Sequence, residues 1–224
     1  MTCIWGVLPV KDLADAKSRL APLLTPEERR TLFPLMVEDV LSALATTRGL
    51  AGVLVLTRDT GAAALAQRYG ARVEPEPENA GQSAAVTRAA RLLAKEGAEG
   101  IVQLPGDVPL ATAAEIEAVL AHHGAAPAVT LVPAHDRRGS NCVAVSPPGL
   151  IAFRFGNDSF LPHLAEAEAA GVEARVLEMP GIALDVDTPE DLARLWRHGG
   201  STRTHDWLRA SGIATRLSRM DDGR

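Results

Sequence analysis

Hydrophobic positions along the 224-residue chain form short apolar runs that are separated by longer amphipathic segments. Short continuous apolar runs are typical of buried strands, and apolar positions that recur at helical spacing are typical of helices. The pattern predicts strands at residues 4–9, 52–56, 71–73, 100–104, 128–132, 142–146, 174–177 and 182–184. It predicts helices at residues 26–45, 60–69, 83–96, 113–122, 159–170 and 189–196.

The first strands indicate the fold class. Those that begin near Ile4, Gly52 and Gly100 are apolar on both faces and are separated by predicted helices. Such strands lie in parallel sheets that helices cover on both sides, so we expect an α/β fold, a three-layer αβα sandwich with a mostly parallel sheet. After Pro127 two strands follow each other closely, which predicts a mixed sheet whose second half forms a cap over the substrate.

The regular pattern ends near His198. We therefore expect a single domain over residues 1–197, a length that suits one substantial core, and a C-terminal tail over residues 198–224. The tail is expected to form a surface helix, to serve as an arm in a homodimer, or to be partly disordered.

Charge and composition narrow the classes of partner. The net charge of −5 argues against nucleic acid or a membrane surface as the main partner, since both need a dominant basic field. The first residues lack a basic leader, and no later stretch approaches the roughly 18 to 20 apolar residues of a spanning helix. Two cysteines are too few for a disulfide framework, so a cytoplasmic protein is expected.

Ligands of an open α/β sheet bind beyond the carboxyl ends of its strands, so function is expected in the loops that follow them. The first such loop reads PVKDLADAKSRL and contains Lys11, Lys17 and Arg19. These cations suit a polyphosphate held by side chains, because the segment matches neither a Walker loop nor a dinucleotide fingerprint. The alternative is a solvated helix face on which Asp12 and Asp15 pair with the basic residues.

Two further loops carry carboxylates that suit a hard divalent cation. In PGDVPL, Asp107 follows Gly106, although turn chemistry alone also favours a Gly-Asp pair. In ALDVDTPEDL, Asp185 and Asp187 face the same side if the strand continues through them, which like charges avoid unless a cation lies between them. Helix capping ahead of Pro189 is the alternative, and it explains Asp187 better than Asp185.

Three polar segments are expected to form walls of the site. In RFGNDSFLPHL, Gly156 permits a free turn and Asp158 or Ser159 begins a helix whose amides suit a phosphate or a carboxylate. The other two segments contribute Ser140 and Asn141 ahead of a strand, and Gly81, Gln82 and Ser83 at a helix start that suits a base or ribose. An ordinary N-cap or polar turn is the alternative for all three segments.

The histidines fall into no catalytic or metal-binding pattern, and no serine lies in a nucleophile elbow. Surface or capping roles are expected for all six, namely His122, His123, His135, His163, His198 and His205.

Taken together, the segments PVK…AKSRLAP, PGDVP, RFGNDSF and DVDTPEDL resemble the 2-phospho-L-lactate guanylyltransferase family in order and approximate spacing. The resemblance runs from about Val7 to Trp196. It implies a nucleotide-diphospho-sugar transferase-like fold and a role in making the deazaflavin coenzyme F-420. The implied substrates are GTP and a small phosphorylated carboxylic acid, with Mg²⁺ as cofactor.

The resemblance also implies residue roles. Asp107, Asp185 and Asp187 stand at the family's magnesium positions, and the basic residues of the first loop are expected to face the triphosphate. The phosphorylated acid is expected at Asn141, Gly156 and Ser159, with Ser140 beside them. The nucleotide is expected at Gly81, Gln82, Ser83, Pro105 and Gly106. Some relatives have threonines where this chain has Ser140-Asn141-Cys142, and its tail is longer.

The acceptor acid stays open between phosphoenolpyruvate, 2-phospho-L-lactate and 3-phospho-D-glycerate. The hydrogen-bonding groups of Ser140 and Asn141 favour the hydroxyl-bearing glycerate. Two other functions also stay open: a metal-dependent nucleotide-sugar glycosyltransferase, because a DVD pair at a strand edge is similar to the metal motif of that class, and a non-catalytic GTP sensor.

Overall fold

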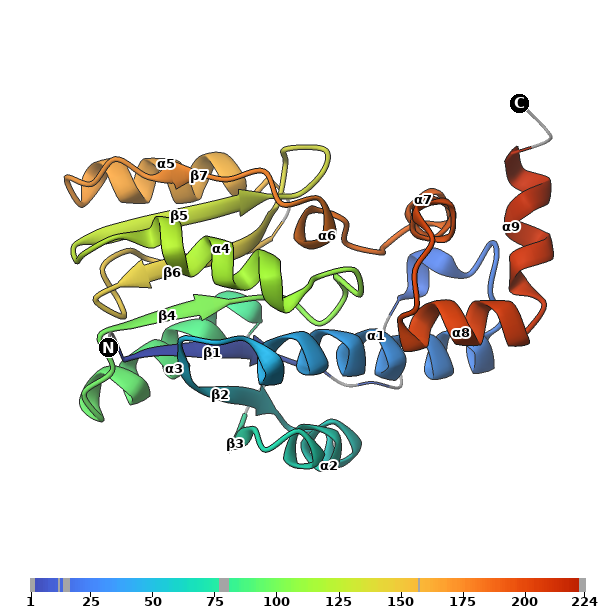
Figure 1. The fold of residues 1–224 in the computed structure, drawn as a ribbon, viewed down its shortest axis with the longest axis horizontal. Coiled ribbons are helices and arrows are strands. Elements are labelled where there is room, and N and C mark those ends of the chain that lie inside the picture. Colours follow the sequence, from blue (N-terminus) through green and yellow to red (C-terminus); the bar gives the residue numbers. More distant parts are fainter. Residues whose placement is uncertain (1–2, 12, 14–16, 77–80, 157, 222–224) are drawn as a thin grey trace.

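The computed structural model of the chain describes residues 3–221 apart from residue 12, residues 14–16, residues 77–80 and residue 157. Its centre is a seven-stranded sheet with the strand order β3-β2-β1-β4-β6-β5-β7 (Figure 1). The strands are β1 Ile4–Pro9, β2 Leu50–Thr57, β3 Arg72–Pro75, β4 Gly100–Gln103, β5 Ala128–Pro133, β6 Ser140–Ser146 and β7 Arg175–Val176. Neighbouring strands are parallel except where β6 pairs with β4 and β5, so the sheet is mixed and mostly parallel.

Helices cover both faces of the sheet, as a three-layer sandwich requires. They are α1 Pro26–Thr46, α2 Thr60–Arg68, α3 Gln82–Lys95, α4 Ala113–His123, α5 Phe160–Ala169, α6 Pro180–Ala183, α7 Pro189–His198, α8 Arg203–Ala210 and α9 Ile213–Asp221. Successive residues of a strand point to opposite faces. Val102 of β4 accordingly packs in the core under α1 and α4, whereas Ile101 packs in the core under α3 and α5.

Several helices begin where the sequence supplies a capping box. The side chains of Thr25, Thr112 and Thr188 each accept a hydrogen bond from the backbone N–H three residues on. The acidic residue at that position bonds back to the N-cap amide in each case, which satisfies donors that the first helical turn leaves free. These signals explain why the starts of α1, α4 and α7 agree with the predicted helices.

The predicted strand at residues 182–184 is wrong, because residues Pro180–Ala183 form the short helix α6. Pro180 occupies the first helical turn, where its fixed φ and missing N–H are tolerated. Gly181 packs against α4 and its preceding loop so closely that an added Cβ would lie 2.3 Å from the carbonyl oxygen of Leu110. The buried apolar residues therefore form a helical turn that packs on α4, and they do not form a strand of the sheet.

β6 carries an irregularity at its first residues. Pro133 pairs with Ser140 and Val132 pairs with Cys142, so Asn141 is the extra residue of a bulge. The side chains of Ser140 and Asn141 contact different parts of the protein: Ser140 contacts His163 of α5, and Asn141 contacts α6 and the segment after it.

The tail forms α8 and α9, which pack against α1 and α7 (Figure 1). Its apolar side chains Leu208, Ile213 and Leu217 are fully buried in the same core as α1. The buried carboxylate of Asp39 in α1 accepts hydrogen bonds from the backbone N–H groups of Arg203 and Thr204 at the start of α8. Across the described part of the chain, no helix combines the length and the apolar character that a membrane crossing needs.

Candidate active site

Three loops from distant parts of the chain meet at the carboxyl ends of β1 and β4. The ammonium Nζ of Lys17 lies 2.5 Å from Asp107 Oδ2 and 2.6 Å from Asp187 Oδ1. The side chain of Lys17 is only 6% exposed, whereas those of Asp107 and Asp187 are 22% and 40% exposed, so the ammonium is buried and its carboxylate partners reach the surface. The first basic loop and the two acidic loops singled out in the sequence therefore lie in direct contact.

The backbone holds the triad in place. Lys17 precedes the 3-10 helix Ser18–Leu20 and has a left-handed backbone conformation with φ of 64°. This conformation sets the direction in which its side chain leaves the backbone. On the other side, the backbone N–H of Val186 donates to the carbonyl of Asp107 over 3.0 Å. Val186 is fully buried, so the flanking Asp185 and Asp187 are fixed beside Asp107.

Asp185 is held by Asn141. Its Oδ1 accepts a hydrogen bond of 3.0 Å from Asn141 Nδ2, which also donates to the carbonyl groups of Ile182 and Ala183. Residues 184–187 form no strand. The condition that a strand continues through both aspartates is therefore not met, and Asn141 and Val186 orient the pair instead.

Opposing electrostatic effects act on these carboxylates. Burial raises the pKa of Asp185, and the nearby charges of Asp107 and Asp187 raise it further. The hydrogen bond from Asn141 lowers this pKa but does not cancel the rise. Burial also favours the neutral form of Asp187, but Lys17 and Arg19 outweigh it and lower the pKa of that carboxyl. Burial likewise opposes the charge of Lys17, yet its two carboxylate partners raise the pKa of the ammonium.

Two carboxylates contact the buried ammonium, and the third, Asp185, lies near those two carboxylates. The donor set therefore suits a hard divalent cation in chemistry. In the described residues, however, no three His, Cys, Asp or Glu side chains are arranged as a ligand set, and Lys17 lies between Asp107 and Asp187. The carboxylates therefore suit a magnesium ion in charge and donor type but not in their present arrangement.

The other basic residues of the first loop differ from Lys17. Arg19 Nη1 lies 3.8 Å from Asp187 Oδ2, and its side chain is 66% exposed, so it borders the triad from the solvent side. Lys11 is exposed. Burial raises the pKa of Glu76, which follows β3, and the positive charge of Lys11 opposes that rise. Asp12 and Asp15, the alternative partners of these basic residues, lie outside the described residues.

Of the predicted acid-binding residues, Ser140 and Ser159 meet at the start of α5, whereas Asn141 contacts Asp185. Ser159 precedes this helix but makes no side-chain capping bond, so an ordinary N-cap does not account for it. Its Oγ accepts a hydrogen bond of 3.0 Å from the backbone N–H of Ser140 instead. Gly156 has φ of 147° with open space around it, a conformation that glycine adopts without strain, and Asp158 pairs with Arg138.

Of the predicted nucleotide-binding residues, Ser83 contacts this loop and Gly106 lies against α1. Ser83 in the first turn of α3 donates through Oγ to the carbonyl of Phe155 over 3.3 Å, which joins that helix to the loop of Gly156. Gly81 has φ of 90° as the residue before α3. An added Cβ on Gly106 would lie 2.9 Å from Val37 Cγ2, so α1 approaches the loop of Asp107 too closely for a larger residue.

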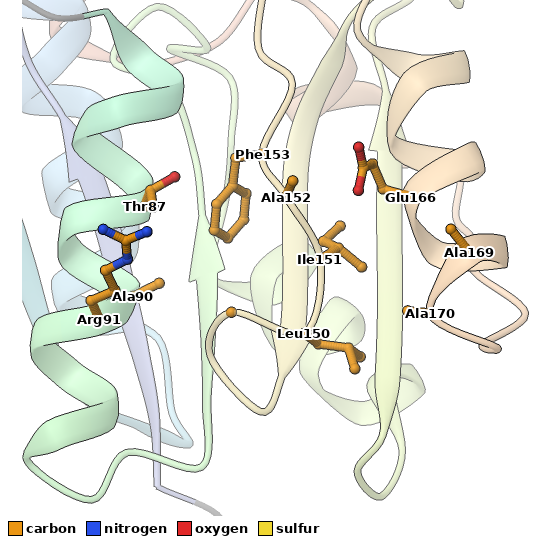
Figure 2. Close-up of a pocket in the computed structure, with 11 residues that line it drawn as sticks. Thr87, Ala90, Arg91, Leu150, Ile151, Ala152, Phe153, Glu166, Ala169 and Ala170 are labelled. Carbon is orange, nitrogen blue, oxygen red and sulfur yellow. The ribbon is translucent and has the colours of Figure 1, made fainter.

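A separate groove of about 510 Å³ lies between α3 and α5 (Figure 2). Arg91 of α3 and Glu166 of α5 lie at its sides, and the apolar residues 149–153 run between the two helices. None of the predicted site residues is among the described residues that line it.

The expected surface roles are wrong for three histidines. His123, His163 and His205 are at most 1% exposed, and each makes hydrogen bonds through both ring nitrogens. His135, which is partly exposed, lies 4.0 Å from Asp185 and 3.7 Å from Asp191. Spacing along the sequence contains no signal for these contacts, since the partners come from other elements.

The comparison with known families agrees with this geometry. Residues 3–224 match the family described as "Guanylyl transferase CofC like". The chain belongs to this family of guanylyltransferases. It is therefore a nucleotidyltransferase, and the resemblance inferred from its motifs is confirmed.

Relatives and solved structures support the assignment to the CofC-like family. A phosphoenolpyruvate guanylyltransferase of Conexibacter woesei is 39% identical over 91% of this chain and 94% of its own length. A 2-phospho-L-lactate guanylyltransferase of Methanothermobacter thermautotrophicus is 32% identical over 99% of this chain and 96% of its own. A putative nucleotide-diphospho-sugar transferase from Desulfovibrio desulfuricans G20 shares the fold, with a TM-score of 0.77, 18% identity and coverage of 97% and 99%. The predicted fold class is thereby confirmed.

Proposed function

We propose that this CofC-like enzyme transfers GMP from GTP to the phosphate of a three-carbon phospho-acid and releases pyrophosphate, in deazaflavin coenzyme biosynthesis. The observation that carries the proposal is the contact of Lys17 with both Asp107 and Asp187, because it places a basic loop suited to a triphosphate against three carboxylates. We propose that the reaction takes place in the cytoplasm.

The chemistry requires positioning and charge neutralisation more than proton transfer. The acceptor phosphate is ionised at neutral pH, so one of its oxygens attacks the α-phosphorus of GTP in line without a general base. The new P–O bond forms as the bond to the β-phosphate oxygen breaks and pyrophosphate leaves. Lys17 and Arg19 offset the charge of the departing pyrophosphate, which explains why no histidine is needed as a base.

We propose that Asp107, Asp185 and Asp187 hold magnesium. When bound, magnesium supplies charge neutralisation at the phosphate oxygens. Asn141 keeps Asp185 oriented toward the other carboxylates through its 3.0 Å hydrogen bond, and Val186 fixes the spacing of the pair. Lys11 lies toward Glu76, so we assign it the outer part of the nucleotide.

Phosphoenolpyruvate is the acceptor that we propose first. The Conexibacter woesei relative and a Rubrobacter xylanophilus relative at 40% identity are both named for that acid. Asn141 supports 3-phospho-D-glycerate less than its place in the sequence indicates. Its amide nitrogen already donates to Ile182, Ala183 and Asp185 and so is not available to the hydroxyl of that acid. Ser140 and Ser159 remain as hydroxyl groups beside Gly156, and we assign the acid to them.

One assay separates the candidate functions. Purified enzyme with Mg²⁺ is mixed with one of the three acids and one of the nucleotides GTP, ATP and CTP, in every combination. Pyrophosphate release is measured, and the mass of the product is determined by mass spectrometry. Pyrophosphate that appears only with GTP and one acid, together with a product of acid plus GMP, supports the proposal. A sugar transfer from GDP-sugar would support the glycosyltransferase, and GTP binding without turnover would support the sensor.

A further inference from the structure

His163 lies in the first turn of α5 and is fully buried, yet both of its ring nitrogens contact the predicted acid-binding residues or their loop. Its Nε2 accepts a hydrogen bond of 2.9 Å from the backbone N–H of Arg154. Its Nδ1 lies 2.9 Å from Ser140 Oγ. The ring also packs edge-on against Phe155, with 4.8 Å between the ring centres, so its orientation is fixed.

These contacts determine which ring nitrogen carries the proton. Burial lowers the pKa of His163 to about 4, so the ring is neutral at neutral pH. A neutral imidazole has one donor and one acceptor, and Nε2 is the acceptor because its partner is a backbone N–H. Nδ1 therefore carries the proton and donates it to Ser140 Oγ.

The direction of this bond sets the role of the serine hydroxyl. Because Ser140 Oγ accepts from His163, its own hydrogen is directed to another acceptor. Ser159 is in a similar position, since its Oγ accepts from the backbone N–H of Ser140. The two hydroxyl groups, whose residues are 5% and 3% exposed, each keep their hydrogen for a further acceptor, and the oxygens of a phosphate are acceptors only.

We propose that His163 is a positioning residue that keeps the Ser140 hydroxyl as a hydrogen-bond donor to the acceptor acid's phosphate. The inference rests on the proposed function, because it takes the acid to lie at Ser140 and Ser159. His163 touches neither substrate, so its substitution acts through Ser140 and affects the acid more than the nucleotide.

The chain offers a matched control in His123. This histidine is 1% exposed, its Nδ1 lies 3.0 Å from Thr130 Oγ1, and its Nε2 lies 3.0 Å from Ser146 Oγ. Burial lowers its pKa to about 4 as well. Ser146 is at the opposite end of β6 from Ser140, roughly 20 Å away at the usual rise of a strand. His123 therefore has the same kind of hydrogen bonds without access to the site.

The test compares the wild type with His163→Leu, His163→Asn, Ser140→Ala, His123→Leu and a double variant that combines His163→Leu with Ser140→Ala. Each protein is measured in steady-state assays of pyrophosphate release with Mg²⁺, GTP and phosphoenolpyruvate. The nitrogen of an asparagine side chain takes nearly the position of the histidine Nδ1, so His163→Asn keeps the donor. Circular dichroism and thermal unfolding check that each variant is folded.

If the inference holds, His163→Leu raises the KM for phosphoenolpyruvate by about tenfold or more, the range expected when a hydrogen bond to a charged group is lost. The KM for GTP stays within about twofold, and His163→Asn recovers most of the loss. Adding His163→Leu to Ser140→Ala has little further effect on the KM for the acid, because His163 acts only through the Ser140 hydroxyl, which Ser140→Ala has already removed. His123→Leu lowers the melting temperature and leaves both KM values unchanged.

Other outcomes overturn the inference. Equal rises of both KM values, or the same kinetic change in His163→Leu and His123→Leu, mean that His163 is only structural. If His163→Leu does not fold, the comparison of His163→Asn with Ser140→Ala decides, and a KM for the acid that rises equally in both contradicts the role of Nδ1. A wild-type enzyme that neither turns over nor binds phosphoenolpyruvate in calorimetry overturns the proposed function itself, whereas an active wild type with unaffected His163 variants overturns only this inference.

Discussion

Lys17 and Asp187 are 170 positions apart in the chain, and the buried ammonium of Lys17 lies 2.6 Å from the partly exposed carboxylate of Asp187. The same ammonium binds Asp107, which follows β4. Each of the three residues comes from a different loop at one edge of the sheet. The fold therefore brings the three charges together, because no short sequence motif contains all of them. The contact therefore depends on the relative placement of β1, β4 and the segment before α7.

Replacing Lys17 removes the buried cation of the triad. We expect Lys17→Ala to lower kcat by about 100-fold, because a preorganised charge near the departing pyrophosphate is lost. Steady-state pyrophosphate release measures the effect, and Lys95→Ala on the exposed end of α3 is the control. Full activity in Lys17→Ala would remove this residue from the proposed mechanism.

Replacing a carboxylate tests the magnesium proposal. We expect Asp107→Ala and Asp185→Ala to stay folded and to lose at least about 100-fold in kcat, with a higher Mg²⁺ concentration needed for half-maximal turnover. Turnover measured across a Mg²⁺ titration checks this. Asp206→Ala serves as the control, since that carboxylate is exposed and pairs with Arg209 on α8. Wild-type turnover in either site variant would show that the ligand assignment is incorrect.

The buried histidines predict a loss of stability in acid. The pKa of His123 and that of His163 are lowered from 6.5 to about 4 in the folded protein. Between these values the unfolded chain binds more protons, so the free energy of unfolding falls as the pH drops from 6.5 to 4, by roughly 3 kcal/mol for each histidine. Urea unfolding at several pH values measures this slope, which His123→Asn should reduce. A slope that is the same in wild type and His123→Asn contradicts the assignment.

The tail contributes to stability. A chain that ends at residue 199 loses Leu208, Ile213 and Leu217 from the core, each worth about 2 kcal/mol of burial. It also leaves the carboxylate of Asp39 without the N–H donors of α8. We expect this truncation to lower the melting temperature strongly or to prevent folding. Unchanged thermal unfolding would mean that the tail is a dispensable arm.

Most of the sheet could be predicted from the sequence, for a physical reason. Alternating apolar and amphipathic segments specify a parallel sheet, and the ends of parallel strands meet at one edge, so the loops with Asp107 and Asp187 were expected near each other. The pattern did not reveal that Lys17 rather than Lys11 reaches them, since that depends on one left-handed backbone conformation.

Other parts of the structure depend on partners that are distant in the chain. The apolar run at 182–184 suited a strand equally well, and its helical form follows from Pro180 and from packing on α4. His163 was expected at the surface because nothing near it in sequence shows that Ser140, 23 residues earlier, would be its partner. Hydrogen-bond partners of single polar residues are thus beyond what periodicity can predict.

Asn141, the extra residue of the bulge in β6, and its neighbour Ser140 contact different groups. Asn141 contacts Asp185, one of the clustered carboxylates, while Ser140 contacts His163 in the part of the enzyme that we propose holds the acid. Changes on the α5 side can therefore alter the choice of acid while the carboxylate side keeps its geometry. Under the proposed assignment, acid selectivity and the placement of the carboxylates therefore depend on separate sets of contacts that begin at neighbouring residues of one strand.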